Sequence, residues 1–141
     1  MLCVFRDSFH MSVSRAQCKY VCISTGNLTT QEICMHPSKL LRYWRCMLRS
    51  LPEYSKVYHL FVADCIMLIK TISNINDALV YFTCMDESEL TEIKNCVNRR
   101  HSAKIFITST SSDEKKTRKV AHKCFLRCFS DEIELKFNKN L

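Results

Sequence analysis

The clearest pattern of apolar and polar positions lies between residues 38 and 51. Its apolar members recur at helical spacing and share one face: Leu40, Leu41, Trp44, Met47, Leu48 and Leu51. Its basic members fall largely on the other faces, with no acid among them: Lys39, Arg42, Arg45 and Arg49. Prolines 37 and 52 bracket the segment, and Ser38 is suited to cap its first turn. The pattern predicts a helix over Ser38–Leu51.

The longest apolar run, from Val57 to Ile69, is interrupted by His59 and Asp64. It is too short to span a bilayer comfortably, and a charge at its middle would be costly there. We therefore expect a buried helix. A further helix is predicted from Asp86, because Glu89 follows three residues later as in a capping box. Its apolar face consists of Leu90, Ile93 and Val97, with Cys96 beside it.

The last predicted helix carries its apolar residues at i, i+1, i+4, i+5, i+8 and i+9. They are Val120, Ala121, Cys124, Phe125, Cys128 and Phe129. This spacing places Cys124 and Cys128 one turn apart on the buried face. The polar tail from Asp131 to Leu141 is expected to fray.

The remaining residues, 1–37, show no comparable pattern beyond a short helix that Ser12–Cys22 could form. We expect a poorly defined N-terminal segment over residues 1–37 and a helical domain over residues 38–141. The single glycine, Gly26, argues against an all-β fold with many tight turns. It also excludes the glycine-rich loops that bind nucleotide phosphates. The predicted fold is all-α, one small domain braced by disulfides.

The net charge is +7, and it is spread over several segments. A basic protein can bind nucleic acid or an anionic membrane. Nucleic acid is not expected as a partner, because no known basic motif accompanies the charge. The basic helix over Ser38–Leu51 could instead lie on a membrane or fit a groove of a partner protein. A core helix with a solvated basic face is the simpler alternative.

The chain has ten cysteines, a density at which thiols tend to be oxidised or bound to metal. Two cysteines one turn apart do not normally pair with each other, so Cys124 and Cys128 would tie their helix to two other elements. Cys96 is a natural partner for one of them. No Cys-x2-Cys exists, which argues against a zinc site. The five histidines show no catalytic or metal-binding spacing, so neither a cofactor nor an enzymatic activity is predicted.

Residues 86–138 resemble part of an insect odorant-binding protein. The resemblance rests on Cys96 at the end of a helix, the long gap to Cys124, and the sequence Lys-Cys-Phe-Leu-Arg-Cys ending at Cys128. That family consists of secreted all-α carriers with three interlocked disulfides. The resemblance implies a Cys96–Cys128 disulfide. The chain has no cysteine after Cys128, so Cys124 would need a partner from upstream.

The function that this resemblance implies is the non-enzymatic transport of small hydrophobic ligands such as odorants. Apolar residues on the inner helix faces would line the pocket: Ile93, Val97, Phe106, Val120, Phe125 and Phe129. It also implies secretion, although residues 1–11 lack the continuous apolar stretch of a signal peptide. The alternative is an intracellular basic interaction protein with free thiols. It would bind a partner protein or an anionic membrane through Ser38–Leu51.

Overall fold

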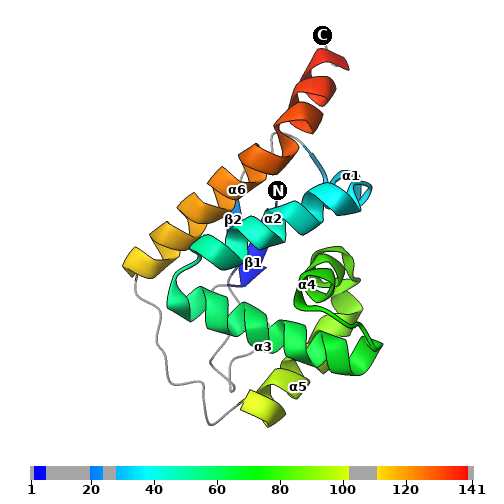
Figure 1. Ribbon diagram of the computed structural model, residues 1–141, viewed down its shortest axis with the longest axis vertical. Helices are drawn as coiled ribbons and strands as arrows, with labels where there is room; N and C mark the ends of the chain where they lie inside the picture. Colours follow the sequence, from blue (N-terminus) through cyan, green and yellow to red (C-terminus); the bar gives the residue numbers. More distant parts are fainter. Residues whose placement is uncertain (1, 6–19, 24–27, 102–110, 140–141) are drawn as a thin grey trace.

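The computed structural model describes residues 2–5, 20–23, 28–101 and 111–139 (Figure 1). Within these residues, two short strands precede six α-helices and one 3₁₀ turn. The elements are β1 (Leu2–Phe5), β2 (Tyr20–Ile23), α1 (Thr30–Cys34), α2 (Pro37–Ser50), α3 (Glu53–Lys70), α4 (Ile75–Cys84), η2 (Glu87–Glu89), α5 (Leu90–His101) and α6 (Ser111–Lys139). Helices make up nearly all of the described chain, so the all-α prediction is confirmed.

The two strands form an antiparallel pair in which Leu2 lies opposite Ile23 and Phe5 opposite Tyr20. The short helix predicted over Ser12–Cys22 is therefore wrong at its C-terminal end, where β2 begins. Residues 12–19 of that prediction lie outside the described residues. Because Tyr20, Val21 and Ile23 are β-branched or aromatic, their residue types favour a strand.

Helix α2 forms where its apolar periodicity predicts it, and it contributes much of the core. Its buried residues are Leu40, Tyr43, Trp44, Cys46 and Met47. The predicted cap is wrong by two positions: His36 is the N-cap, Pro37 opens the helix, and no side chain caps it. Proline suits this place because the first helical position needs no backbone N–H. The indole of Trp44 donates a hydrogen bond to Thr83 Oγ1 of α4 at 2.8 Å.

Helix α3 confirms the buried helix expected over Val57–Ile69. The residue after its last position, Thr71, is the C-cap, and its φ of 57° lies in the left-handed region. No single helix of the described part is long and apolar enough to cross a membrane. Together α3 and α4 reach that length and composition, but the pair is bent by 87°.

The helix predicted from Asp86 begins with η2 and continues as α5. Asp86 accepts a hydrogen bond from the Ser88 N–H, and the Glu89 carboxylate in turn has a backbone hydrogen bond to Asp86, as the predicted capping box requires. The carboxylate of Glu89 also pairs with Lys70 at 2.6 Å and accepts from the Tyr81 hydroxyl at 2.7 Å. These contacts join the end of α3, α4 and the start of α5. The predicted apolar face is buried, as is Cys96.

The polar tail that was expected to fray is helical as far as Lys139. Ion pairs between helices explain the difference. Glu132 pairs with Lys39 of α2 at 2.6 Å, and Lys136 pairs with Glu32 of α1. Each ion pair joins α6 to α1 or α2, and sequence periodicity does not reveal such long-range contacts.

Helices α1, α4 and α6 pack against α2. Helix α6 runs along one side of α2, and α4 packs against another (Figure 1). Helix α3 follows α2, runs below it in this view and packs against α4 and α5. The expected boundary at residue 37 does not separate two parts of the fold, because Leu28 and Ile33 belong to the same core cluster as α2–α6.

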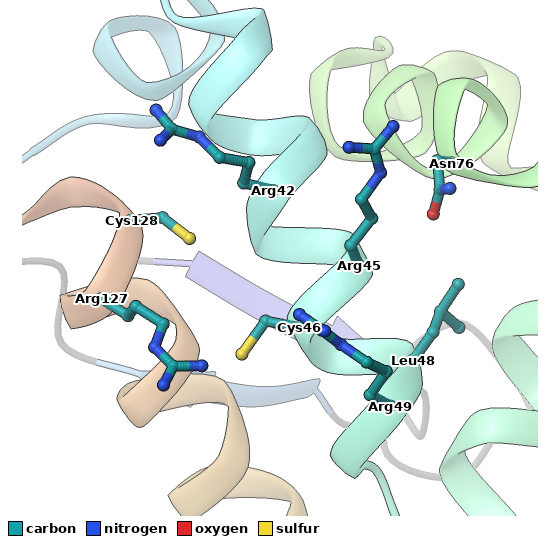
Figure 2. A pocket seen from close by; sticks show the side chains of 8 residues that line it. All are labelled: Arg42, Arg45, Cys46, Leu48, Arg49, Asn76, Arg127 and Cys128. Carbon is teal, nitrogen blue, oxygen red and sulfur yellow. The ribbon is translucent and has the colours of Figure 1, made fainter.

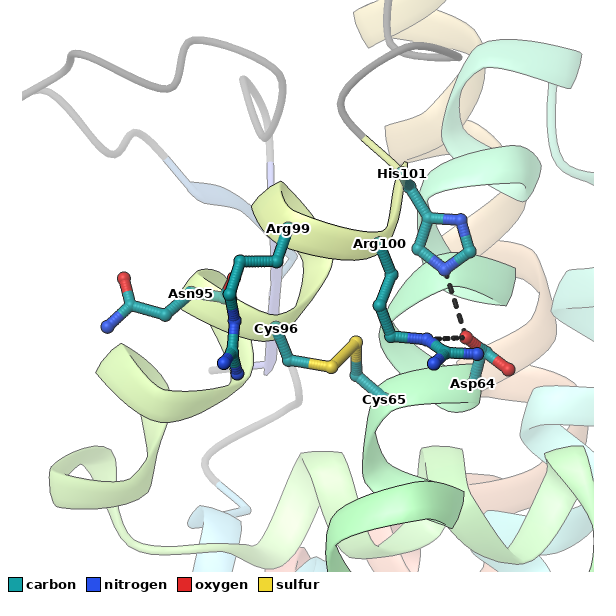
Figure 3. The surroundings of a disulfide bond; sticks show 7 residues. All are labelled: Asp64, Cys65, Asn95, Cys96, Arg99, Arg100 and His101. Atoms are coloured by element: carbon teal, nitrogen blue, oxygen red, sulfur yellow. Dashed lines mark hydrogen bonds and ion pairs between the residues drawn. A yellow bond between two sulfur atoms is a disulfide. The ribbon is translucent and has the colours of Figure 1, made fainter.

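Among the described residues, three disulfides brace this arrangement. They join α1 to α4 through Cys34–Cys84, α2 to α6 through Cys46–Cys124, and α3 to α5 through Cys65–Cys96. The disulfide-braced fold is thus confirmed, and Cys124 does take an upstream partner. The implied Cys96–Cys128 pairing is wrong, because Cys96 pairs with Cys65 (Figure 3). Cys128 is a free, half-buried thiol. The physical reason is that α5 packs against α3, which places Cys65 next to Cys96.

Candidate anion-binding site

A cavity of about 660 Å³ lies between α2 and α6, with the start of α4 at its edge (Figure 2). The residues around it are mostly basic or polar: Arg42, Arg45, Cys46, Leu48, Arg49, Asn76, Arg127 and Cys128. No acidic side chain is among these lining residues. The composition of the wall therefore favours a negatively charged occupant.

Helix geometry places three arginines along one wall. Arg42, Arg45 and Arg49 are three and seven residues apart, so they lie within about 60° of one another around α2. They extend about 10 Å along the axis. Figure 2 shows them projecting from α2, while Arg127 and Cys128 come from α6 on the other side. We call Arg42, Arg45, Arg49 and Arg127 the arginine cluster.

The arginine cluster has no counterion among the residues that the structure describes. The four residues are exposed. None of the four forms an ion pair or a side-chain hydrogen bond with any residue that the structure describes. Other cations do find acids, as Lys39 does in Glu132 and Lys70 in Glu89. The cluster therefore keeps its charge and its guanidinium donors available for a ligand.

The thiol of Cys128 lies within the field of the cluster. Burial raises the pKa of this thiol above its usual value, while the charges of Arg42 and Arg127 oppose that shift. The phenol of Tyr43 lies nearby and is fully buried. Burial, with a smaller contribution from Cys128, raises the pKa of Tyr43. Its hydroxyl has no hydrogen-bond partner in the described part of the chain.

The polar edge of the cavity is formed by Asn76 near the start of α4. Its Oδ1 is buried and has no hydrogen-bond partner among the described residues. A buried carbonyl oxygen without a partner is costly, so a donor from a bound molecule would stabilise it. Leu48, which is half-buried, adds an apolar side chain to the lining that contains the arginines and Asn76.

The residues predicted to bind a hydrophobic ligand do not line this cavity. Ile93, Val97, Phe125 and Phe129 are buried in the core, and Val120 is half-buried against it. The rings of Phe125 and Phe129 stack with their centroids 4.8 Å apart, which fills the space between α6 and its neighbours. Phe106 lies outside the described residues. The structure thus places the five described residues in one packed core.

A second polar cluster joins α3 to α5 beside the Cys65–Cys96 disulfide (Figure 3). One carboxylate oxygen of Asp64 accepts from Arg100 Nε and lies 3.0 Å from His101 Nε2. Burial raises the pKa of Asp64, but these two partners outweigh it and lower that pKa overall. Cys65 lies within reach of both groups, yet its sulfur is already in a disulfide. Two remaining ligands are too few for a structural zinc site.

A third polar group, His59, is fully buried in the core of the protein. Its Nδ1 lies 2.7 Å from the carbonyl oxygen of Ser55, one turn earlier in α3. Its ring packs against Trp44, with centroids 5.2 Å apart. Burial lowers the pKa of His59 to about 4, so the ring is neutral at pH 7. No described cavity reaches it, and its role is structural.

We compared the chain with known protein families, curated proteins and solved structures, and none of the three comparisons found a match. The resemblance to odorant-binding proteins stays a prediction. Sequence reasoning had singled out the arginines of α2 but missed Arg127 and Asn76. Arg127 directly precedes Cys128 and flanks the apolar face of its helix. This position was the signal that could have indicated Arg127.

Proposed function

We propose that this protein is an extracellular binding protein that recognises an anionic partner through the arginine cluster. The observation that carries the proposal is a cavity whose described lining includes four guanidiniums and no carboxylate. The proposal combines two of our sequence-based expectations. It keeps the binding role expected for the basic helix, now α2, and it keeps the oxidising environment expected for a cysteine-rich chain.

The type of cation supports anion recognition. Guanidinium presents several N–H donors in a planar fork, which suits the paired oxygens of a carboxylate, sulfate or phosphate. Four such groups around one recess concentrate positive potential, because the protein wall excludes part of the screening solvent. A ligand that places negative charge there would relieve the mutual repulsion of the arginines.

The environment of the protein is supported by its disulfides. Three bridges between different helices are compatible with an oxidising, extracellular setting, where such bonds form and persist. They weigh against the intracellular, free-thiol form of the alternative function. Transport of a hydrophobic ligand remains a prediction, and no described cavity is lined by the residues expected to serve it.

The experiment that tests the proposal is charge reversal within the cluster. We would measure the binding of R42E/R45E/R49E to three fluorescent anionic probes in about 0.1 M salt. The probes are a heparin-type hexasaccharide, vesicles containing phosphatidylserine, and a short DNA duplex. The matched control is K115E/K116E/K119E, which makes the same charge change at exposed positions near the start of α6.

We expect the cluster variant to bind at least one probe at least tenfold more weakly than the wild type, and the control to stay within about threefold. Equal losses in the two variants would mean that only net charge matters, which would contradict the proposal. Binding to no probe by the wild type would contradict it as well. Circular dichroism and intact mass would verify that both variants are folded and oxidised.

A further inference from the structure

We infer that the anion recognised by the arginine cluster is a sulfated saccharide. The inference rests on the proposed function and specifies the chemistry of its ligand. It follows from three properties of the cavity: its concave shape, the absence of aromatic side chains among its described lining residues, and a buried acceptor beside the arginines that has no partner in the described chain.

Shape argues against a membrane surface as the partner. The four guanidiniums surround a recess of about 660 Å³ between two helices, whereas a bilayer presents a broad surface. Peripheral membrane binding also uses apolar side chains that enter the acyl region. The large apolar side chains that are most exposed, Met35, Leu68, Leu135 and Phe137, do not line this cavity. A narrow chain can enter the recess more readily than a bilayer can.

Residue chemistry argues against nucleic acid. Proteins that bind single strands stack bases on aromatic side chains beside a basic groove. None of the eight side chains around the cavity is aromatic. Duplex recognition would need an element that fits a groove, but the guanidiniums come from two helices, α2 and α6, around a recess (Figure 2).

The amide of Asn76 points to a ligand that also donates hydrogen bonds. Its Oδ1 is buried at the cavity edge and lacks a partner among the described residues. Sulfate and fully ionised phosphate groups have no donor to offer, whereas a sugar ring carries hydroxyl groups. A sulfated sugar therefore matches both the arginines and Asn76. Leu48 supplies an apolar surface for the C–H face of a sugar ring.

The dimensions and the compartment agree with this choice. The three arginines of α2 span about 10 Å along the helix axis, comparable with one disaccharide unit. Arg127 on α6 can contact the opposite side of such a chain. Disulfides indicate an oxidising environment, and sulfated polysaccharides are polyanions of the extracellular surface.

The test compares ligands that differ in one chemical property at a time. The probes are a heparin-type hexasaccharide, the same hexasaccharide without sulfate groups, linear polyphosphate, and vesicles containing phosphatidylserine. Calorimetry would give the dissociation constants for the wild type, R127Q and N76A. Polyphosphate has charge but no sugar hydroxyl, so it isolates the contribution of Asn76. Arg118→Gln serves as the control for R127Q, because Arg118 is an exposed arginine of α6 away from the cavity.

We expect the sulfated hexasaccharide to bind most tightly and its desulfated form at least tenfold more weakly. R127Q should weaken binding of the sulfated form about tenfold, and R118Q should not. N76A should weaken its binding about fivefold while leaving polyphosphate binding unchanged, because only the saccharide donates to Oδ1.

Two sets of results would overturn the inference in different ways. If vesicles or polyphosphate bound as tightly as the sulfated sugar through the arginines, the saccharide inference would fail and the proposed function would stand. The saccharide inference would also fail, with the proposed function intact, if N76A weakened the binding of polyphosphate and of the hexasaccharide equally or left both unchanged. If no anionic probe depended on the arginine cluster, both the inference and the proposed function would fail.

Discussion

Removing the Cys65–Cys96 disulfide should lower the stability of the protein by several kcal/mol. The double substitution C65A/C96A takes away a link between α3 and α5 that closes a loop with a sequence separation of 31. The chain-entropy relation for a loop of that length gives a loss of about 3.7 kcal/mol in the free energy of unfolding. Both cysteines are buried, so their smaller replacements add a modest packing loss.

The control is C128S, which removes a free thiol instead of a bridge. We expect it to change the free energy of unfolding by less than about 1 kcal/mol, as is usual for a site outside the packed core. Guanidinium denaturation of the oxidised proteins at pH 7 would measure both values. Alkylation followed by intact mass should show one label fewer for C128S than for wild type. The double variant should take up as many labels as the wild type.

The two variants together can refute the pairing that the structure shows. A bridge between Cys96 and Cys128, as the resemblance implied, would make C128S as destabilising as C65A/C96A. It would also free Cys96, so that C128S would take up one label more than the wild type. A loss below about 1 kcal/mol in C65A/C96A would contradict the entropy reasoning itself.

Three further predictions concern the core and a helix cap. For His59, the pKa of about 4 in the folded state lies below the ordinary value of about 6.5. The stability that depends on a neutral His59 is therefore complete above pH 6.5 and is lost as the pH falls, by about 2–3 kcal/mol at pH 4.5. Urea unfolding of H59F should depend less on pH than that of wild type. F125A should lower the free energy of unfolding by about 3–5 kcal/mol because its ring is fully buried, whereas thermal unfolding of exposed L126A should stay close to wild type. T29A removes the bond of the α1 capping box in which the Thr29 hydroxyl accepts from the Glu32 N–H, while the backbone N–H of residue 29 can still donate to the Glu32 carboxylate. The loss should be about 1 kcal/mol in denaturant unfolding; T29S should retain most of that stability, and equal losses would exclude capping as the cause.

The helices could be predicted from the sequence because their signals are local. Apolar residues at helical spacing identified α2, the start of α5 and the buried face of α6. Within a helix, residues three or four positions apart lie on the same face regardless of the tertiary structure. The same local rule grouped the arginines of α2 before their surroundings were known.

Local rules failed where a contact joins distant residues. The tail after Asp131 reads as frayed by composition, but Glu132 and Lys136 find partners on α2 and α1. Glu89 was predicted only as a capping residue, and its carboxylate also bonds to Lys70 and Tyr81. In each case the fold adds a partner that the local sequence does not reveal.

By itself, the sequence determined an all-α chain with an amphipathic, arginine-bearing helix and enough cysteines to brace it. The tertiary structure alone decided which cysteines meet, because a disulfide forms between the sulfurs that helix packing brings together. Packing of α2 against α6 also placed Arg127 opposite the arginines of α2, and packing of α4 brought Asn76 to the same recess. The candidate site forms only in the folded protein, because its residues come from three helices and no spacing along the chain relates one helix to another.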